Sequence, residues 1–520
     1  LESAWSEERW FLVCFKVILG LQLLNDVVLS LWAAHQLHHR FRAAASETFE
    51  GVRPAMPWPL RLKRGLRWAA APAALAILLV LFHLEENWRG RRAWAAVERE
   101  AVARGDHLEL DRPVVSKVPA SQNFAAAPIW GPGWNSRGQR ASPAPLASVS
   151  LSLNGRPRGW VSWDQSRGWT RQKKTDLERW EKEYQALKLI PTNAEPISVS
   201  ANILAAFSRF DPQIEELREA SRRPHCAPPG PGGLDWPDLL VVCNVGELLR
   251  YRASAELAEG QVLEAFEDVR LCLRLVDLLE VMPGTQAQLL RRDLLGAALQ
   301  PVWEGLAQGC WPDEYLCWFQ DRLGRIDLLA DYPRVVRATI LQQIDHWRQR
   351  RAERAQKTGL WRLTRLFSPV GWTYRNQAEV YRLYRGPLAE AVAPGGQRVF
   401  PAKLNASLID LQSPAVRWRN AYELTSLPQT YARVQAGLNQ ALVACALERY
   451  RMDFGTYPET LDLLHPAYLD PMPRDPCTGR PLLYLRRSAD EFVLYSVGWN
   501  EQDDGGLSHQ EADWVWKYPQ

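Results

Sequence analysis

The sequence holds few residues whose type and spacing are typical of catalysis. Asp106 precedes His107 and Asp345 precedes His346, and a carboxylate beside a histidine can orient the imidazole as a general base. Neither pair has a nucleophile at a recognisable spacing, and the sequence contains no HExxH, GxxxxGK[ST] or G-x-S-x-G motif. A triad assembled only in three dimensions stays open. The sequence therefore predicts no particular reaction.

Two further patterns have metal or nucleotide chemistry as one interpretation. His35, His38 and His39 could ligate a metal from one helical face. They lie in a basic stretch after an apolar segment, and a basic flank beside a membrane explains them better. The segment GPGWNSRG, which starts at Gly131, lies in a proline-rich stretch and follows no predicted strand. A dinucleotide site is therefore not predicted there.

Charge and cysteine usage exclude two broad classes. The chain of 520 residues has 63 Lys plus Arg against 59 Asp plus Glu, a formal net charge of +4. This excess is too small to make nucleic-acid binding the default, so no nucleic-acid partner is predicted. The eight cysteines include no CxxC pair and no dense cluster, which excludes a zinc knuckle and a small disulfide scaffold. We expect them to be buried thiols within apolar helices.

A membrane anchor is expected in the first hundred residues. Residues 68–84 form an uncharged apolar run near the lower length limit for crossing a hydrocarbon core. Basic residues precede the run, and Glu85 and Glu86 follow it. The positive-inside rule then places everything after about residue 86 outside the cytoplasm. A buried core helix is the alternative interpretation.

Residues 1–67 are expected to contain a second apolar helix and a basic cytoplasmic loop. The apolar segment Phe11–Ala34 is long enough to span, but Asp26 near its centre makes insertion costly. With residues 68–84 it would form a helical hairpin whose loop, residues 35–67, is cytoplasmic. Because the chain begins at Leu1 and not at Met, further spans upstream are considered as well.

The middle of the chain is predicted to be helical. Residues 85–174 combine a juxtamembrane helix that ends at Gly105 with a proline-rich irregular region, and residues 175–395 form a helical domain. Further helices are expected at about 285–308, 312–325 and 332–357. The clearest unit is a helical hairpin that turns at Gly260. Its second helix carries one apolar stripe of Val262, Phe266, Val269, Leu273 and Val276.

The end of the chain changes character. Residues 396–429 are expected to be a linker, and residues 430–520 a small domain in which a long helix ends near Gly455. The runs PLLYLRR, EFVLYSVG and DWVW predict three short strands. The expected fold class is therefore mainly α. A membrane-anchored helical domain is followed by a small α+β domain, in which a long helix packs on a short antiparallel sheet.

The succession of ALERYRMDFGTYPETLDLL, PMPRDPCTGRPLLY and FVLYSVGWNEQDDGG resembles the globular end of major pseudopilins from type II secretion systems. The match covers residues 430–516 and includes a Tyr-Pro turn, a DP-x-G-x-P-x-x-Y segment that is one residue longer here, and a Ser-x-Gly strand end before an acidic loop. The prepilin-peptidase signal of pseudopilins and its adjoining hydrophobic helix are absent before residue 430. The longer layout also resembles a poorly characterised bacterial family with a membrane anchor, a helical middle and a pseudopilin-like end.

The resemblance to pseudopilins implies a calcium site in the acidic loop. Asn500 stands where that family has a loop aspartate, Asp513 stands where an aspartate precedes the last strand, and Asp503 and Asp504 lie between them. Ca²⁺ takes about six to eight oxygen ligands, which these side chains and loop carbonyls would supply if both ends of the loop meet. Asn500 carries no charge, which lowers the expected affinity. A solvated DDGG turn without a metal is the alternative.

Three functions stay open at this point. The first is a bacterial inner-membrane protein that binds or scaffolds other proteins through its extracytoplasmic helical domain, with a link to secretion. The second is a hydrolase of envelope material with a site in the helical domain. Two carboxylates, or a His with a carboxylate, that converge in a cleft with strongly shifted pKa values would favour it. The third is a subunit of a transport system, suggested by Asp26 in the first apolar segment.

Overall fold

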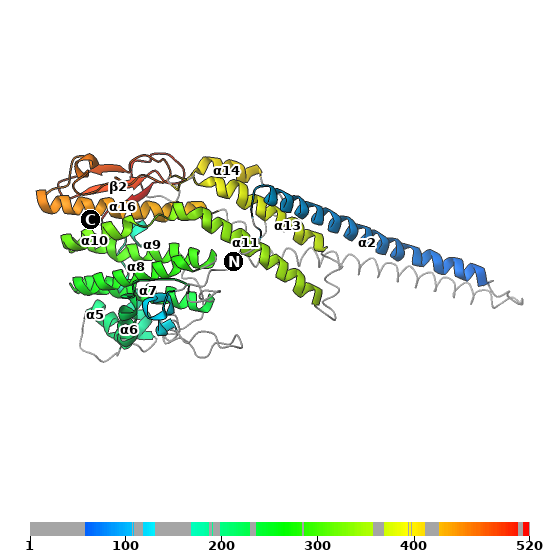
Figure 1. The fold of residues 1–520 in the computed structure, drawn as a ribbon, viewed down its shortest axis with the longest axis horizontal. Coiled ribbons are helices and arrows are strands. Elements are labelled where there is room, and N and C mark those ends of the chain that lie inside the picture. The colour runs from blue at the N-terminus through cyan, green and yellow to red at the C-terminus, as the bar shows by residue number, and fades with distance from the viewer. Residues whose placement is uncertain are drawn as a thin grey trace, which may run out of the picture. The chain divides into compact units, whose positions relative to one another are not determined.

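The computed structural model shows a chain that divides into two compact units (Figure 1). One unit comprises Leu1–Glu100, Arg351–Glu379 and Gln412–Leu424, and the other comprises Ala101–Arg350, Val380–Leu411 and Thr425–Gln520. The structure describes residues 58–106, 108, 118–130, 168–186, 190, 198–228, 236–282, 285–356, 369–393, 395–396, 398–410, 426–507 and 513–518. The expected span Phe11–Ala34 and the histidines that follow it lie outside the described residues.

The first unit contains two helices that cross, α2 (Trp58–Ala103) and α13 (Val370–Leu383). Glu86 on α2 accepts hydrogen bonds from the indole nitrogen of Trp372 at 2.6 Å and from the guanidinium of Arg375 at 2.5 Å. The Asn87 side chain accepts a hydrogen bond from the backbone N–H of Gly371 at 2.7 Å. Asn87 thus satisfies one of the first-turn backbone N–H groups of α13, which have no partner within their own helix, and Glu86 binds side chains of the first two turns.

The expected membrane anchor is not supported. Residues 68–84 belong to α2, which continues as one helix past Glu85 and Glu86 to Ala103. Within the described part of the chain, no helix combines the length and the apolar character that crossing a bilayer requires. The uncharged run is shorter than the ~20 residues of a typical span, and charged residues follow it in the same helix. This finding overturns the assignment of residues 68–84 as a transmembrane helix and, with it, the expected inner-membrane location.

The second unit is a helical bundle that carries a small sheet. Its helices are α4 (Leu177–Ala186), α5 (Val199–Phe207), α6 (Asp211–Ser221), α7 (Trp236–Ala258), α8 (Val262–Val281), α9 (Thr285–Gln308), α10 (Asp313–Gly324), α11 (Leu328–Gln356, whose end belongs to the first unit), α14 (Pro401–Asp410) and α16 (Leu427–Phe454). Short helical turns are η1 (Ala120–Gln122), η2 (Phe124–Ala126), η3 (Pro128–Trp130), η4 (Gly168–Arg171), η5 (Ser208–Phe210), η7 (Tyr384–Leu388), η8 (Ala389–Ala391) and η9 (Leu461–Leu464). Helix α7 packs against α5, α8 and α9.

The predicted helical hairpin is confirmed. Helix α7 ends at Ala258, α8 begins at Val262, and Gly260 between them has φ +75°, a left-handed conformation that suits glycine. Most of the predicted apolar stripe of α8 is buried, including Phe266, Val269 and the residues that continue it. Because α7 and α9 both pack on α8, the stripe is covered as its periodicity requires.

The mainly helical fold and its small antiparallel sheet are confirmed. Strands β1 (Leu483–Arg486), β2 (Phe492–Ser496) and β3 (Trp514–Trp516) form one sheet in the order β1-β2-β3, with both pairs antiparallel. Helix α16 ends at Phe454, and Gly455 follows with φ +70°. It packs against α9 and α10 of the bundle and against β2 and β3 of the sheet (Figure 1). Since α16 packs against both the bundle and the sheet, the two form one folded unit.

The described part of the proline-rich region is more ordered than its composition suggests. Turns η1, η2 and η3 follow one another, and Phe124 and Ile129 are fully buried. Asn123 forms a parallel bridge with His225, its side-chain oxygen accepts from the backbone N–H of Ala227 at 2.9 Å, and its amide donates to the carbonyl of the same residue at 3.0 Å. Side-chain hydrogen bonds therefore fix backbone that neither a helix nor a strand stabilises.

Candidate functional site

The acidic loop brings three of its four predicted ligands together. The Asn500 amide donates to Asp504 Oδ2 at 2.9 Å. Asp513 accepts hydrogen bonds from the backbone N–H groups of Asp504 at 3.3 Å and Gly506 at 2.7 Å. Asp503 Oδ1 accepts hydrogen bonds from the Tyr495 hydroxyl at 3.1 Å and from the backbone N–H of Gly505 at 2.9 Å. The two ends of the loop thus meet, as the calcium hypothesis requires.

The loop's oxygens are nevertheless engaged by the protein itself. Both carboxylate oxygens of Asp513 accept backbone hydrogen bonds, and Asn500 Oδ1 accepts from the N–H of Gln502 at 3.1 Å. Asp513 is buried, and this burial raises the pKa of its carboxyl. Among the described residues, no group of three or more His, Cys, Asp or Glu side chains is arranged to hold a metal. Calcium binding by this loop stays a prediction.

A second carboxylate of the small domain has a structural role. Asp475, in the DP-x-G-x-P segment, accepts hydrogen bonds from the N–H of Cys477 at 2.7 Å, the Ser496 hydroxyl at 3.0 Å and the N–H of Val497 at 3.1 Å. It joins the turn before β1 to the end of β2. All four residues are buried. Two of the three sequence motifs that carry the resemblance to pseudopilins, the DP-x-G-x-P segment and the Ser-x-Gly strand end, therefore meet at one side chain.

The helical bundle contains an ionic cluster that sequence analysis missed. Asp268 on α8 and Glu256 on α7 meet at one atom, Arg252 Nε, which lies 3.1 Å from Asp268 Oδ2 and 2.9 Å from Glu256 Oε1. Arg218 on α6 binds Asp268 Oδ1 at 2.5 Å, and Arg252 also reaches Asp211 on α6 at 2.9 Å. The exposed fraction is 0% for Asp268 and 1% for Glu256. We call these five residues the ionic cluster; its carboxylates on α7 and α8 are buried, whereas the Asp211 side chain is 54% exposed.

Burial sets the protonation of this cluster. Desolvation raises the pKa of Glu256 to about 8, and the negative charge of Asp268 adds to the rise while Arg252 opposes it. Desolvation raises the pKa of Asp268 to about 6, with Arg252 and Arg218 acting in the opposite direction. Asp268 has the two closest cations, which favour its ionised form, whereas desolvation and the charge of Asp268 favour the protonated form of Glu256.

The cluster does not support the hydrolase hypothesis. Two carboxylates with shifted pKa values do converge in the helical domain, but they are covered by protein and engaged by arginines. A substrate cannot reach groups that are almost completely buried. The sequence contains only a weak indication of this cluster. Asp268 directly precedes Val269 of the apolar stripe, which suggests burial, but its partners lie on α6 and α7, and the sequence does not show that these helices pack against Asp268.

Of the two acid–histidine pairs, only Asp345–His346 lies wholly within the described residues, and each described acid binds another partner. Asp345 accepts from the Gln349 side chain at 2.6 Å, one helical turn away, and His346 is exposed. Asp106 forms an ion pair with Arg385 at 2.8 Å and accepts from the Tyr381 hydroxyl at 3.1 Å. Its neighbour in sequence, His107, lies outside the described residues.

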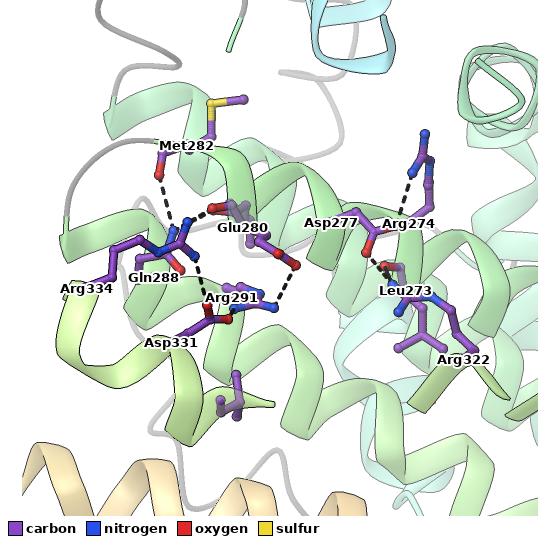
Figure 2. A network of polar contacts seen from close by, with 12 residues as sticks. Leu273, Arg274, Asp277, Glu280, Met282, Gln288, Arg291, Arg322, Asp331 and Arg334 are labelled. Atoms are coloured by element: carbon purple, nitrogen blue, oxygen red, sulfur yellow. Dashed lines mark hydrogen bonds and ion pairs between the residues drawn. The ribbon is translucent and has the colours of Figure 1, made fainter. Parts of the chain in front are cut away.

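A second polar network joins four helices of the bundle (Figure 2). Arg291 on α9 binds Asp331 on α11 at 2.6 Å and Glu280 on α8 at 2.7 Å. Asp277 on α8 pairs with Arg322 on α10 and with Arg274 of its own helix. Figure 2 shows the two groups at neighbouring positions along α8, each with arginines pointing at a carboxylate. Their contacts stay within the bundle, which indicates a structural role.

An aromatic cluster with one exposed ring, Phe454, and two half-buried tyrosines lies at the end of α16. Phe454, with 60% of its surface exposed, packs on Tyr450 at a ring-centroid distance of 4.4 Å, and Tyr450 contacts Tyr468 at 5.6 Å. The Tyr468 hydroxyl donates to Asp453 at 2.5 Å, which ties the segment after η9 to the helix. We call Tyr450, Phe454 and Tyr468 the α16 end patch. Aromatic groups exposed on a rigid element are typical of protein interfaces.

Comparison with known proteins identifies no relative of this chain. No protein-family model matches it, and neither a curated protein nor a solved structure matches it significantly.

Proposed function

We propose that this chain is a binding or scaffold protein that docks another protein on the α16 end patch. The observation that carries the proposal is the exposure of Phe454 and its ring contacts at the end of a helix held from both sides. A preformed aromatic anchor loses little conformational entropy on binding, which favours its use as an interface centre.

The rigidity of α16 supports this proposal. Gln440 donates to the carbonyl of Trp514 in β3 at 2.5 Å, and Arg449 binds Asp313 of α10 at 2.7 Å. The helix is therefore fixed to the sheet and to the bundle shortly before its exposed end. A partner bound at Phe454 would be held at a defined orientation to both parts. The resemblance of residues 430–516 to pseudopilins favours a secretion protein as this partner.

The experiment is site-specific photo-cross-linking in cells that express the full chain. A photo-reactive phenylalanine analogue replaces Phe454, and we expect one discrete adduct with a different protein. Met452 is the matched control, because it is 44% exposed on the same turn and two residues away, on the other side of the helix. The analogue at Met452 should give no such adduct.

A second measurement separates binding from folding. Phe454→Ser and Met452→Ser should both melt within a few degrees of the original chain, because both side chains are exposed. Only Phe454→Ser should lose the partner identified by cross-linking. An adduct that joins two copies of this chain, or the same adducts from both positions, contradicts the proposal.

A further inference from the structure

We propose that Glu256 and Asp268 share one proton, and that this proton holds α6 on α7 and α8 as a pH-sensitive latch. The inference is independent of the proposed binding function. It starts from the two carboxylates that meet at Arg252 Nε inside the bundle, with distances of 2.9 Å to Glu256 and 3.1 Å to Asp268. Two ionised carboxylates that share one cation repel each other, and burial strengthens the repulsion.

An unsatisfied oxygen of Glu256 indicates where the proton lies. Glu256 Oε2 is buried and has no hydrogen-bond partner among the described residues, whereas Asp268 Oδ2 lies 3.1 Å from Arg252 Nε without a hydrogen bond to it. Two buried acceptors cannot bond with each other while both are ionised. A proton on Glu256 removes one of the two negative charges that face Arg252 and turns a buried acceptor into a donor. The direction of the pKa shift of Glu256 agrees with this assignment.

The charges around Glu256 come from three helices. Arg252 lies on α7 itself, Asp268 on α8, and Arg218 and Asp211 on α6. Arg218 also lies 3.5 Å from Glu215, an exposed residue of α6. Of the other helices packed on α7, α5 contains no charged residue, and Glu304 of α9 is engaged by Thr175 and Gln300 at 2.6 Å each. With Glu256 protonated, the positive charges of the two arginines balance the negative charges of the two aspartates in the cluster.

Two ion pairs, Arg218–Asp268 and Asp211–Arg252, hold α6 on the bundle. Loss of the proton would weaken both, because an ionised Glu256 repels Asp268 and competes with Asp268 and Asp211 for Arg252. Ile214, Leu217 and Ala220 would still pack on the bundle, so α6 should open more often without detaching permanently.

The segment after α6 would transmit this change. Arg223 donates to the carbonyl of Ala120 at 2.9 Å, and His225 exchanges backbone hydrogen bonds with Gln122 at 3.1 Å and Phe124 at 2.8 Å. When α6 opens, η1 to η3 lose the support of these residues. Phe124, which is fully buried, would then be exposed more often.

Hydrogen–deuterium exchange of the full chain at pH 7 and pH 9 tests the latch. After correction for the intrinsic exchange rate, the protection of α6 amides should fall about tenfold over this range. Glu256→Gln cannot ionise and should keep the protection constant. Glu264→Gln, an exposed position on α8, is the matched control and should behave like the original chain. Equal protection of α6 in the original chain at both pH values would overturn the proposal, as would a fall of the same size in Glu256→Gln.

Infrared spectroscopy gives a second measurement that does not depend on the folding of a variant. At pH 7 exposed carboxyls are ionised, so the C=O stretch of a protonated carboxyl must come from a buried group. We expect this band in the original chain at pH 7 and its loss at pH 9. Its absence at pH 7 contradicts the shared proton, even if Glu256→Gln fails to fold.

Discussion

Gly90 on α2 and Gly371 on α13 cross with their backbones in contact. A Cβ atom added to Gly90 would lie 2.0 Å from the carbonyl oxygen of Gly371, and one added to Gly371 would lie 1.9 Å from the carbonyl oxygen of Glu86. No side chain can be accommodated at either position without moving a helix. This close approach lets Glu86 and Asn87 reach the first turn of α13.

Gly90→Ala should therefore destabilise the contact between α2 and α13. The added methyl group would clash with the backbone of α13, which cannot move without shifting the helix. Overpacking of this kind destabilises a protein by about 1–3 kcal/mol. We expect faster hydrogen exchange at the start of α13 and a lower melting temperature. Gly386→Ala is the control, because a Cβ there meets no atom within 4 Å. If both variants behave alike, the close crossing does not exist in solution.

Asp475→Asn should destabilise the small domain. The carboxylate accepts three hydrogen bonds from Cys477, Ser496 and Val497, and an amide in its place would turn an NH₂ group toward one of these donors. A lost buried hydrogen bond to a charged acceptor costs about 1.5–3 kcal/mol. Urea unfolding measures the loss. Asp462→Asn, an exposed carboxylate on η9, should change the unfolding midpoint little.

The stability of the chain should depend on pH through Glu256. Its pKa in the folded state, about 8, lies above the ordinary value of 4.5, so the folded chain binds this proton more tightly than the unfolded chain. The contribution is fully present below pH 4.5 and is lost as the pH rises toward 8. Glu256→Gln should remove this slope, so the difference in unfolding free energy between the two proteins should change with pH in that window. A difference that is constant from pH 5 to pH 9 contradicts the assignment.

Calcium should raise the melting temperature of the chain if the acidic loop binds it. A ligand that binds only the folded state stabilises it by mass action, about 2.7 kcal/mol at a concentration 100 times the Kd. Asp504→Asn should reduce the response, because Asp504 contributes a loop carboxylate that contacts Asn500. Asp490→Asn, in the exposed turn between β1 and β2, is the control. An unchanged melting temperature at about 1 mM calcium contradicts the site.

Local patterns predicted several elements correctly. The stripe through Phe266 and Val269 predicted the buried face of α8, and the glycines at 260 and 455 predicted where helices end. Turn residues between two aromatic runs predicted the pairing of β1 and β2, in which Leu483 lies opposite Tyr495. These features depend on neighbours in the chain, and periodicity and turn chemistry therefore predict them.

Local patterns failed where a feature depends on its surroundings. The apolar run at residues 68–84 suggested an anchor, yet the helix continues through Glu85 and Glu86. Phe124 lies in a proline-rich stretch that suggested irregular surface, yet it is fully buried, because Asn123 and His225 fix the backbone around it. The composition of a segment does not show which other part of the chain packs against it.

The sequence alone determined the hairpin of α7 and α8, the end of α16, where the three strands lie, and which side chains stand in the acidic loop. It did not predict α14, which lies in the expected linker. Tertiary structure decided what these side chains do. It turned Asp503 toward Tyr495, placed Asp475 between the ends of two motifs, and brought Glu256, Asp268 and Arg218 from three helices into one buried cluster. The physical reason is that charge interactions and burial depend on distances across the fold, whereas helix periods and glycine turns are properties of a few consecutive residues.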